Sequence, residues 1–100
     1  MSRRIFPDDD RLAELCHRHG IRRLALFGST LRGTARPDSD VDLLVEFKPD
    51  SIPGLFQLVG IARELSELLG GKQVDLRTPA ELSKYFRDEV LAEAEVQFAA

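Results

Sequence analysis

Residues 27–45 read FGSTLRGTARPDSDVDLLV and connect two apolar runs. The first run, 24–27, ends at the dipeptide Gly28-Ser29. The second run, 41–47, overlaps the triplet Asp40-Val41-Asp42, which follows the dipeptide after a spacer of ten residues. Each apolar run is typical of a β-strand, and the two strands are expected at 21–27 and 41–47. The segment therefore predicts a strand, a turn, a short basic spacer and a pair of carboxylates where a second strand opens.

Gly28 and Ser29 are suited to binding a phosphate group. Gly28 has no side chain, so the backbone can turn sharply there and approach a ligand closely. Ser29 can begin a short helix, whose free N–H groups and hydroxyl favour an anion. A Gly-Ser pair is more often an ordinary turn, so its meaning here depends on the residues that follow it.

Asp40 and Asp42 lie two positions apart, so on a strand both side chains leave the same face. Two adjacent carboxylates repel each other, and a divalent cation relieves that repulsion. Mg²⁺ is the natural candidate because it prefers carboxylate oxygens together with substrate phosphates. Alone, the segment 37–40 would be a solvated turn, since Asp and Ser bond their own backbone. The combination of the Gly-Ser turn and the two carboxylates favours a site that binds a metal ion and a phosphate.

These residues resemble the signature of the nucleotidyltransferase superfamily that includes DNA polymerase beta: Gly-Ser, a spacer of about this length, then Asp-x-Asp. The resemblance covers nearly the whole chain and is closest to the minimal nucleotidyltransferases, small prokaryotic proteins often paired with a HEPN-domain toxin. It implies an α/β (α+β) fold, the nucleotidyltransferase core, with helices packed on a small mixed β-sheet. Family members carry a third carboxylate on a neighbouring strand, and Asp75 is the best candidate for it.

The resemblance also implies a mechanism and residue roles. Asp40, Asp42 and Asp75 would be catalytic and would bind Mg²⁺, while Gly28 and Ser29 would hold the phosphates of ATP. Asp75 would also draw the proton from an acceptor hydroxyl, which attacks the α-phosphorus as pyrophosphate leaves. The implied acceptor is a tyrosine of a HEPN toxin. The protein would then be an antitoxin of the type VII kind that acts by transferring AMP.

Two other classes of function stay open. A binding module would mask its toxin by direct contact and would use the site, if at all, only to bind nucleotide. Its expected contact surface would include Ile52, Leu55 and Phe56, or the segment 96–98, although the same residues would also suit a core. A small-molecule nucleotidyltransferase, of the kind that modifies antibiotics, would normally need an additional helical domain for the acceptor.

Length and composition predict one domain, residues 1–100, with no room for a second domain that grips the base, so base selectivity is expected to be weak or supplied by a partner. The 43% hydrophobic and 31% charged residues are ordinary for a soluble globular protein. A net charge of −3 argues against direct nucleic-acid binding as a main role. No run reaches the roughly 18 apolar residues of a membrane span. The absence of a secretory signal and the single Cys16 fit a reducing cytoplasm.

The remaining elements follow from caps, breakers and periodicity. The aspartates at 8–10 predict the start of a helix that Gly20 ends. A third strand is expected at 73–77, and a capping box at 78–81 opens a further helical region that continues to Ala94. Between the second and third strands, an apolar stripe at helical spacing predicts a helix packed on the sheet. The stripe consists of Leu55, Leu58, Val59, Ala62, Leu65 and Leu69.

Overall fold

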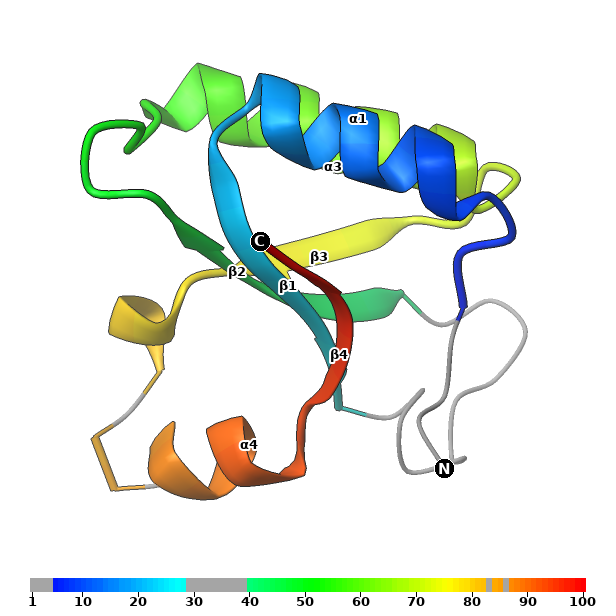
Figure 1. Cartoon of the computed structure of the whole chain (residues 1–100). Coiled ribbons are helices and arrows are strands. Elements are labelled where there is room, and N and C mark those ends of the chain that lie inside the picture. The colour runs from blue at the N-terminus through cyan, green and yellow to red at the C-terminus, as the bar shows by residue number, and fades with distance from the viewer. Residues whose placement is uncertain (1–4, 29–39, 83, 86) are drawn as a thin grey trace.

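The computed structural model describes residues 5–28, 40–82, 84, 85 and 87–100. These residues form helices and strands whose order along the chain is shown by colour in Figure 1. The elements are α1 (Asp9–Arg18), β1 (Ile21–Phe27), β2 (Val41–Phe47), α3 (Leu55–Leu68), β3 (Val74–Arg77), the 3-10 turn η1 (Pro79–Glu81), α4 (Arg87–Glu93) and β4 (Glu95–Ala99).

The four strands form one mixed sheet in the order β3-β2-β1-β4. Strand β1 pairs antiparallel with both β2 and β4, whereas β2 and β3 are parallel. Parallel neighbours need a crossover connection, and α3 supplies it between β2 and β3. The expected small mixed sheet with packed helices is therefore confirmed.

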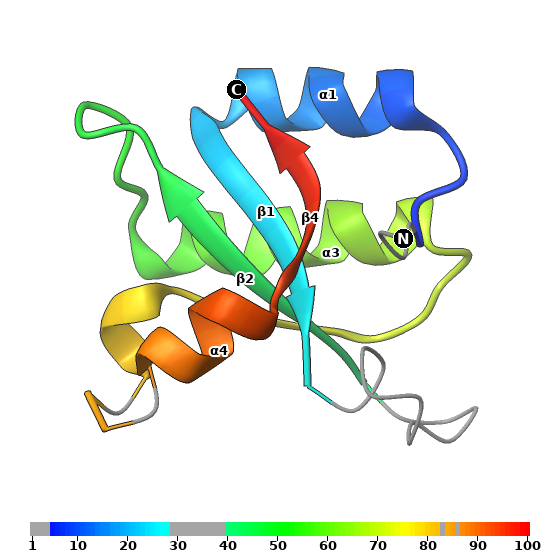
Figure 2. The ribbon, with the colours of Figure 1, turned by 60° about the horizontal axis from the view of Figure 1, so that its bottom comes forward.

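The helices lie on both faces of the sheet. Helices α1 and α3 run side by side over one face, while α4 and η1 lie beyond the opposite face (Figures 1 and 2). The main core fills the space between the sheet and the α1–α3 layer, where alternate residues of β1 and β2 point. Its buried members are Phe6, Leu12, Leu15, Cys16, Ile21, Leu24, Leu26, Val41, Leu43, Val45, Ile61 and Leu65.

Helix α1 begins and docks as its sequence indicates. Asp8 is its N-cap, and the Asp8 carboxylate accepts a hydrogen bond from the Arg11 backbone N–H at 3.1 Å. At the other end, the Arg18 guanidinium and the His19 ring each lie 2.6 Å from a carboxylate oxygen of Glu64 on α3. The hydrogen bond from Arg18 is the main reason that the pKa of Glu64 is lowered. These contacts fasten α1 to α3 above the sheet.

The expectation that the whole apolar stripe of α3 packs on the sheet is wrong for its first half. Leu55 is 75% exposed and Val59 is 54% exposed, whereas Leu65 is fully buried. Ile61, which is not part of the stripe, is also fully buried. Periodicity identifies an apolar side of a helix but not how far the sheet extends beneath it. Only the second half of α3 contributes to the core.

This correction predicts different stability effects for two truncations in the same helix. Leu65→Ala is expected to lower the free energy of unfolding by about 2–4 kcal/mol, because it leaves a cavity in the core. Val59→Ala, its matched control, is expected to change that free energy by less than about 0.5 kcal/mol. Urea unfolding followed by circular dichroism measures both. Equal losses for the two variants would contradict the burial described above.

The C-terminal part differs from the expected continuous helical region. Thr78 makes no side-chain capping hydrogen bond, and only the short η1 turn follows it before α4. The chain then forms β4, which pairs with β1. Without β4 the backbone groups along that side of β1 would form an unpaired edge, which explains why strand pairing prevails over helix continuation there.

The described helices all fall short of the length and apolar character that a membrane span requires.

Candidate active site

Three of the predicted site residues lie close together near the point where β1 ends and β2 begins. Gly28 directly follows β1, and Asp42 is the second residue of β2, paired with Phe27. On its other side Asp42 is paired in parallel register with Asp75 of β3. Residues in register on neighbouring strands project from the same face, so these two carboxylates lie next to each other on one face of the sheet. That face is the one opposite α1 and α3, because Val41 and Leu43, which flank Asp42 on β2, belong to the core beneath those helices.

Gly28 lies directly against the Asp42 carboxylate. Its φ is +78°, a conformation that residues with a side chain rarely adopt. A Cβ atom built on Gly28 would come within 2.3 Å of Asp42 Oδ2. Glycine is therefore required at this position both for the turn and for the room that the carboxylate occupies.

Asp75 is held by a cation from its own strand. Arg77 Nε donates to Asp75 Oδ1 at 3.2 Å, and Arg77 Nη2 donates to Asp75 Oδ2 at 3.3 Å. The pKa of Arg77 is raised mainly by the hydrogen bond to Asp75, then by the charges of Asp75, Glu81 and Asp42. The sequence reasoning missed Arg77, although a basic residue two positions after a strand carboxylate projects from the same face and is a recognisable signal.

Other predicted site residues are less closely assembled. Asp40 lies just before β2 and is exposed, and Ser29 lies outside the described residues. Within the described ranges, no three histidine, cysteine, aspartate or glutamate side chains lie close enough together to form a ready-made metal site. The structure therefore brings Gly28, Asp42 and Asp75 together, and it does not gather Asp40 into a cluster with them.

The chemistry of this donor set fits a hard divalent cation. Carboxylate oxygens are the ligands that Mg²⁺ prefers. The guanidinium of Arg77 on Asp75 shows that this carboxylate accepts a positive charge in the folded protein. Because Gly28 has no side chain, it leaves room for the Asp42 carboxylate at the end of β1. The residues that would hold a metal ion are thus Asp42 and Asp75, joined by Asp40 from the approach to β2.

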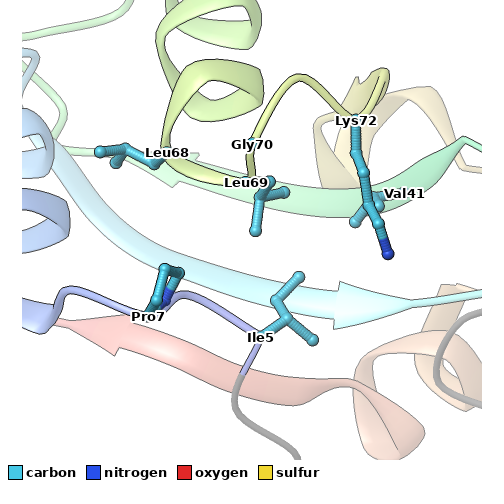
Figure 3. Close-up of a pocket in the computed structure, with 7 residues that line it drawn as sticks. All are labelled: Ile5, Pro7, Val41, Leu68, Leu69, Gly70 and Lys72. Atoms are coloured by element: carbon cyan, nitrogen blue, oxygen red, sulfur yellow. The ribbon is translucent and has the colours of Figure 1, made fainter.

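An apolar cavity of about 340 Å³ lies elsewhere, on the side of the sheet that α1 and α3 cover (Figure 3). Val41 faces this cavity, and it alternates along β2 with Asp42, which faces the other way. The lining includes no carboxylate, so the cavity does not belong to the site. It is lined by Ile5, Pro7, Val41, Leu68, Leu69, Gly70 and Lys72.

Comparison with known families places this fold and site in a defined class. The family model of the nucleotidyltransferase domain matches residues 11–96. The match covers most of the chain. It includes β1, β2 and the whole signature from Gly28 to Asp42. The chain belongs to the nucleotidyltransferase domain family.

Within that family, the chain is a minimal nucleotidyltransferase. It is 41% identical over 80 residues to the protein adenylyltransferase MntA of Thermococcus cleftensis, covering 80% of this chain and 78% of that protein. A solved structure described as a minimal nucleotidyltransferase is 40% identical, with a TM-score of 0.69 and coverage of 86% of this chain and 85% of that one.

Two solved toxin–antitoxin structures share the fold at lower identity. One is a toxin–antitoxin with AMP-PNP, with a TM-score of 0.70, 20% identity, and coverage of 93% of this chain and 74% of that chain. The other is a tri-AMPylated HEPN toxin of Shewanella oneidensis in complex with an MNT antitoxin. It has a TM-score of 0.62, 17% identity, and coverage of 92% of this chain and 70% of that chain. At these identities the likeness establishes the fold.

Proposed function

We propose that this protein transfers AMP from ATP to a hydroxyl group of a partner protein, in a reaction that depends on Mg²⁺. The observation that carries the proposal is the register pairing of Asp42 with Asp75, beside a glycine turn that leaves room for the Asp42 carboxylate. Two carboxylates and a phosphate-binding turn at one sheet edge are what positioning a metal-bound triphosphate requires. The nucleotidyltransferase family and the adenylyltransferase name of the T. cleftensis relative support the same reaction.

Each residue of the site has a role in this proposal. Asp40, Asp42 and Asp75 hold the divalent cation through their carboxylate oxygens, and Gly28 and Ser29 hold the terminal phosphates through backbone N–H groups and a hydroxyl. Bound Mg²⁺ would neutralise charge on the phosphates and on the leaving pyrophosphate. Asp75 accepts the proton of the acceptor hydroxyl, whose oxygen forms the new bond to the α-phosphorus as the bond to pyrophosphate breaks.

The acceptor that we propose is a tyrosine of a HEPN toxin, which AMP transfer would inactivate. The chain would then act as an antitoxin in the cytoplasm, where ATP is supplied. The tri-AMPylated HEPN toxin bound by an MNT antitoxin of the same fold supports this choice of partner. The proposal is tested by pyrophosphate release from each of the four nucleoside triphosphates, with a HEPN toxin as acceptor. Release is expected to require ATP, the acceptor and Mg²⁺, and to stop when EDTA is added. Release that is independent of the acceptor would contradict the proposal.

A second candidate function, masking of the partner by direct contact, is favoured by one surface. Four apolar side chains stand exposed at the start of α3 and just before it, and we call them the α3 apolar face: Ile52, Leu55, Phe56 and Val59. Phe56 is 92% exposed, and residues 55–60 carry no charge. Large apolar side chains exposed close together in the sequence in this way are typical of a protein–protein contact. The segment 96–98, the other expected contact surface, contributes little to such a contact: Gln97 is buried, Phe98 packs against the core, and Val96 is 37% exposed.

The α3 apolar face predicts an effect on partner binding that is separate from catalysis. Phe56→Asp is expected to weaken the complex with the toxin by about thirtyfold or more, as the loss of a central aromatic contact commonly does. Tyr85→Asp is the matched control, since Tyr85 is also an exposed aromatic residue and lies outside this face. Calorimetric titration of the toxin measures both affinities. An unchanged affinity for Phe56→Asp would remove the α3 apolar face from the interface.

A further inference from the structure

Arg77 occupies the position beside Asp75 that a bound cation would compete for. Its guanidinium makes two hydrogen bonds to the two oxygens of Asp75, at 3.2 and 3.3 Å. Both side chains remain partly accessible, 49% for Arg77 and 37% for Asp75. A guanidinium that engages both oxygens of a carboxylate fixes its orientation as well as its charge. Asp75 is thus already oriented by a residue of its own strand.

The surroundings of Arg77 are acidic on several sides. Arg77 lies opposite Leu44 in the β2–β3 register, two positions beyond the Asp42–Asp75 pair. Besides Asp75, the charges of Glu81 and Asp42 favour its protonated form. Like charges placed directly opposite one another on neighbouring strands destabilise a sheet. Arg77 offsets that repulsion between Asp42 and Asp75 from within the chain.

We infer that Arg77 is the resting counter-ion of the site: it holds Asp75 in place until a divalent cation binds, and it must then release that carboxylate. The inference rests on the proposed function insofar as Asp42 and Asp75 take a metal ion. Arg77 acts through Asp75 and is a positioning residue. The guanidinium and the metal ion compete for the same oxygens, so Arg77 weakens the binding of the metal ion alone. A residue that merely braces β3 would have no such effect, because its loss would leave metal affinity unchanged or reduce it.

The test is a calorimetric titration of the protein with Mn²⁺ alone, without nucleotide. Arg77→Gln removes the charge and keeps most of the side chain, and its affinity for Mn²⁺ is expected to rise by about fivefold, the upper range for an exposed ion pair. Arg77→Lys keeps the charge and is expected to stay within about twofold of the unaltered protein. Unchanged or weaker Mn²⁺ binding by Arg77→Gln would overturn the inference.

Arg22→Gln is the matched control for this series. Arg22 forms a similarly exposed pair with a strand carboxylate, at 2.9 Å from Glu46, and lies at the opposite end of β1 from Gly28. The same loss of one positive charge there is expected to leave Mn²⁺ affinity within about twofold, because the charge is distant and screened. An equal gain in Arg22→Gln would show a general effect of net charge and would overturn the role of Arg77.

A second measurement uses the unaltered protein and does not depend on any variant folding. The Nε–H signal of Arg77 in a ¹H–¹⁵N spectrum is expected to shift as Mg²⁺ is added, because its bond to Asp75 breaks. If the protein binds Mg²⁺ and this signal does not move, the inference fails while the proposed function stands. If the protein binds neither Mg²⁺ nor Mn²⁺, the metal-dependent function fails, and the inference fails with it.

Discussion

Asp42→Asn is expected to lower the rate of nucleotidyl transfer by about a thousandfold, the loss that follows when a principal electrostatic group of an active site is removed. Asp42 lies at the centre of the candidate site. It pairs with Phe27 on one side and with Asp75 on the other, and it packs against Gly28. Asparagine has nearly the same shape as aspartate, so the strand pairing should survive. It lacks the negative charge that a metal ligand supplies. A single-turnover assay of AMP transfer to the toxin measures the rate.

Asp50→Asn is the matched control for this change. Asp50 undergoes the same substitution in the exposed loop between β2 and α3, outside the site. It is expected to keep full activity, and the double variant Asp40→Asn/Asp42→Asn is expected to be as inactive as Asp42→Asn. Thermal unfolding establishes that each variant is folded. A folded Asp42→Asn protein with a rate within tenfold of the unaltered one would contradict the role given to this carboxylate.

Gly28→Ala is expected to reduce transfer by about a hundredfold, because displacement of a reactive group by about 1 Å has an effect of that size. The added Cβ would lie 2.3 Å from Asp42 Oδ2, so the carboxylate or the turn must move. Alanine must also adopt the φ of +78° that this turn requires. That strain is expected to lower the free energy of unfolding by about 1–3 kcal/mol. Transfer assays and urea unfolding of the same preparation measure the two effects.

Gly60→Ala separates the local effect from a general effect of adding a methyl group. Gly60 lies within α3, and a Cβ there would meet no atom within 4 Å. Alanine in a helix interior is expected to raise the free energy of unfolding by up to about 1 kcal/mol. Activity should be unchanged. If Gly28→Ala were as active and stable as Gly60→Ala, the packing of Gly28 on Asp42 would have no functional meaning.

The strands next to the signature were the most predictable part of the fold. The structure has β1 at Ile21–Phe27 and β2 at Val41–Phe47, the bounds that the sequence predicts, because each is an apolar run between strong breakers. Strand β4 could not be predicted in the same way. Its residues come directly after the expected helical region, with no glycine or proline between them, and the open side of β1 provides their pairing partner. The local sequence pattern therefore predicts the two central strands, β1 and β2. It does not predict β4, whose conformation depends on pairing with a strand that is distant in the sequence.

In the candidate site, too, local features could be predicted from the sequence and long-range features could not. The spacing of Gly28, Asp40 and Asp42 is a local property and was visible in the sequence, and Asp75 was named from the family resemblance. The register that places Asp75 beside Asp42 is a long-range property, which spacing alone does not determine. The spacing of Arg77 from Asp75 is also local and recognisable, but its two hydrogen bonds to Asp75 and the acidic charges around it are seen only in the fold. The roles of all these residues in transfer remain predictions.

The measurement that tests the central claim most directly is the intact mass of a HEPN toxin after incubation with this protein, Mg²⁺ and ATP. The account predicts a gain of whole AMP units on the toxin that disappears when Asp40→Asn/Asp42→Asn replaces the unaltered protein. A toxin whose mass does not change, in a stable complex that both versions of the protein form equally well, would contradict AMP transfer and favour masking through the α3 apolar face.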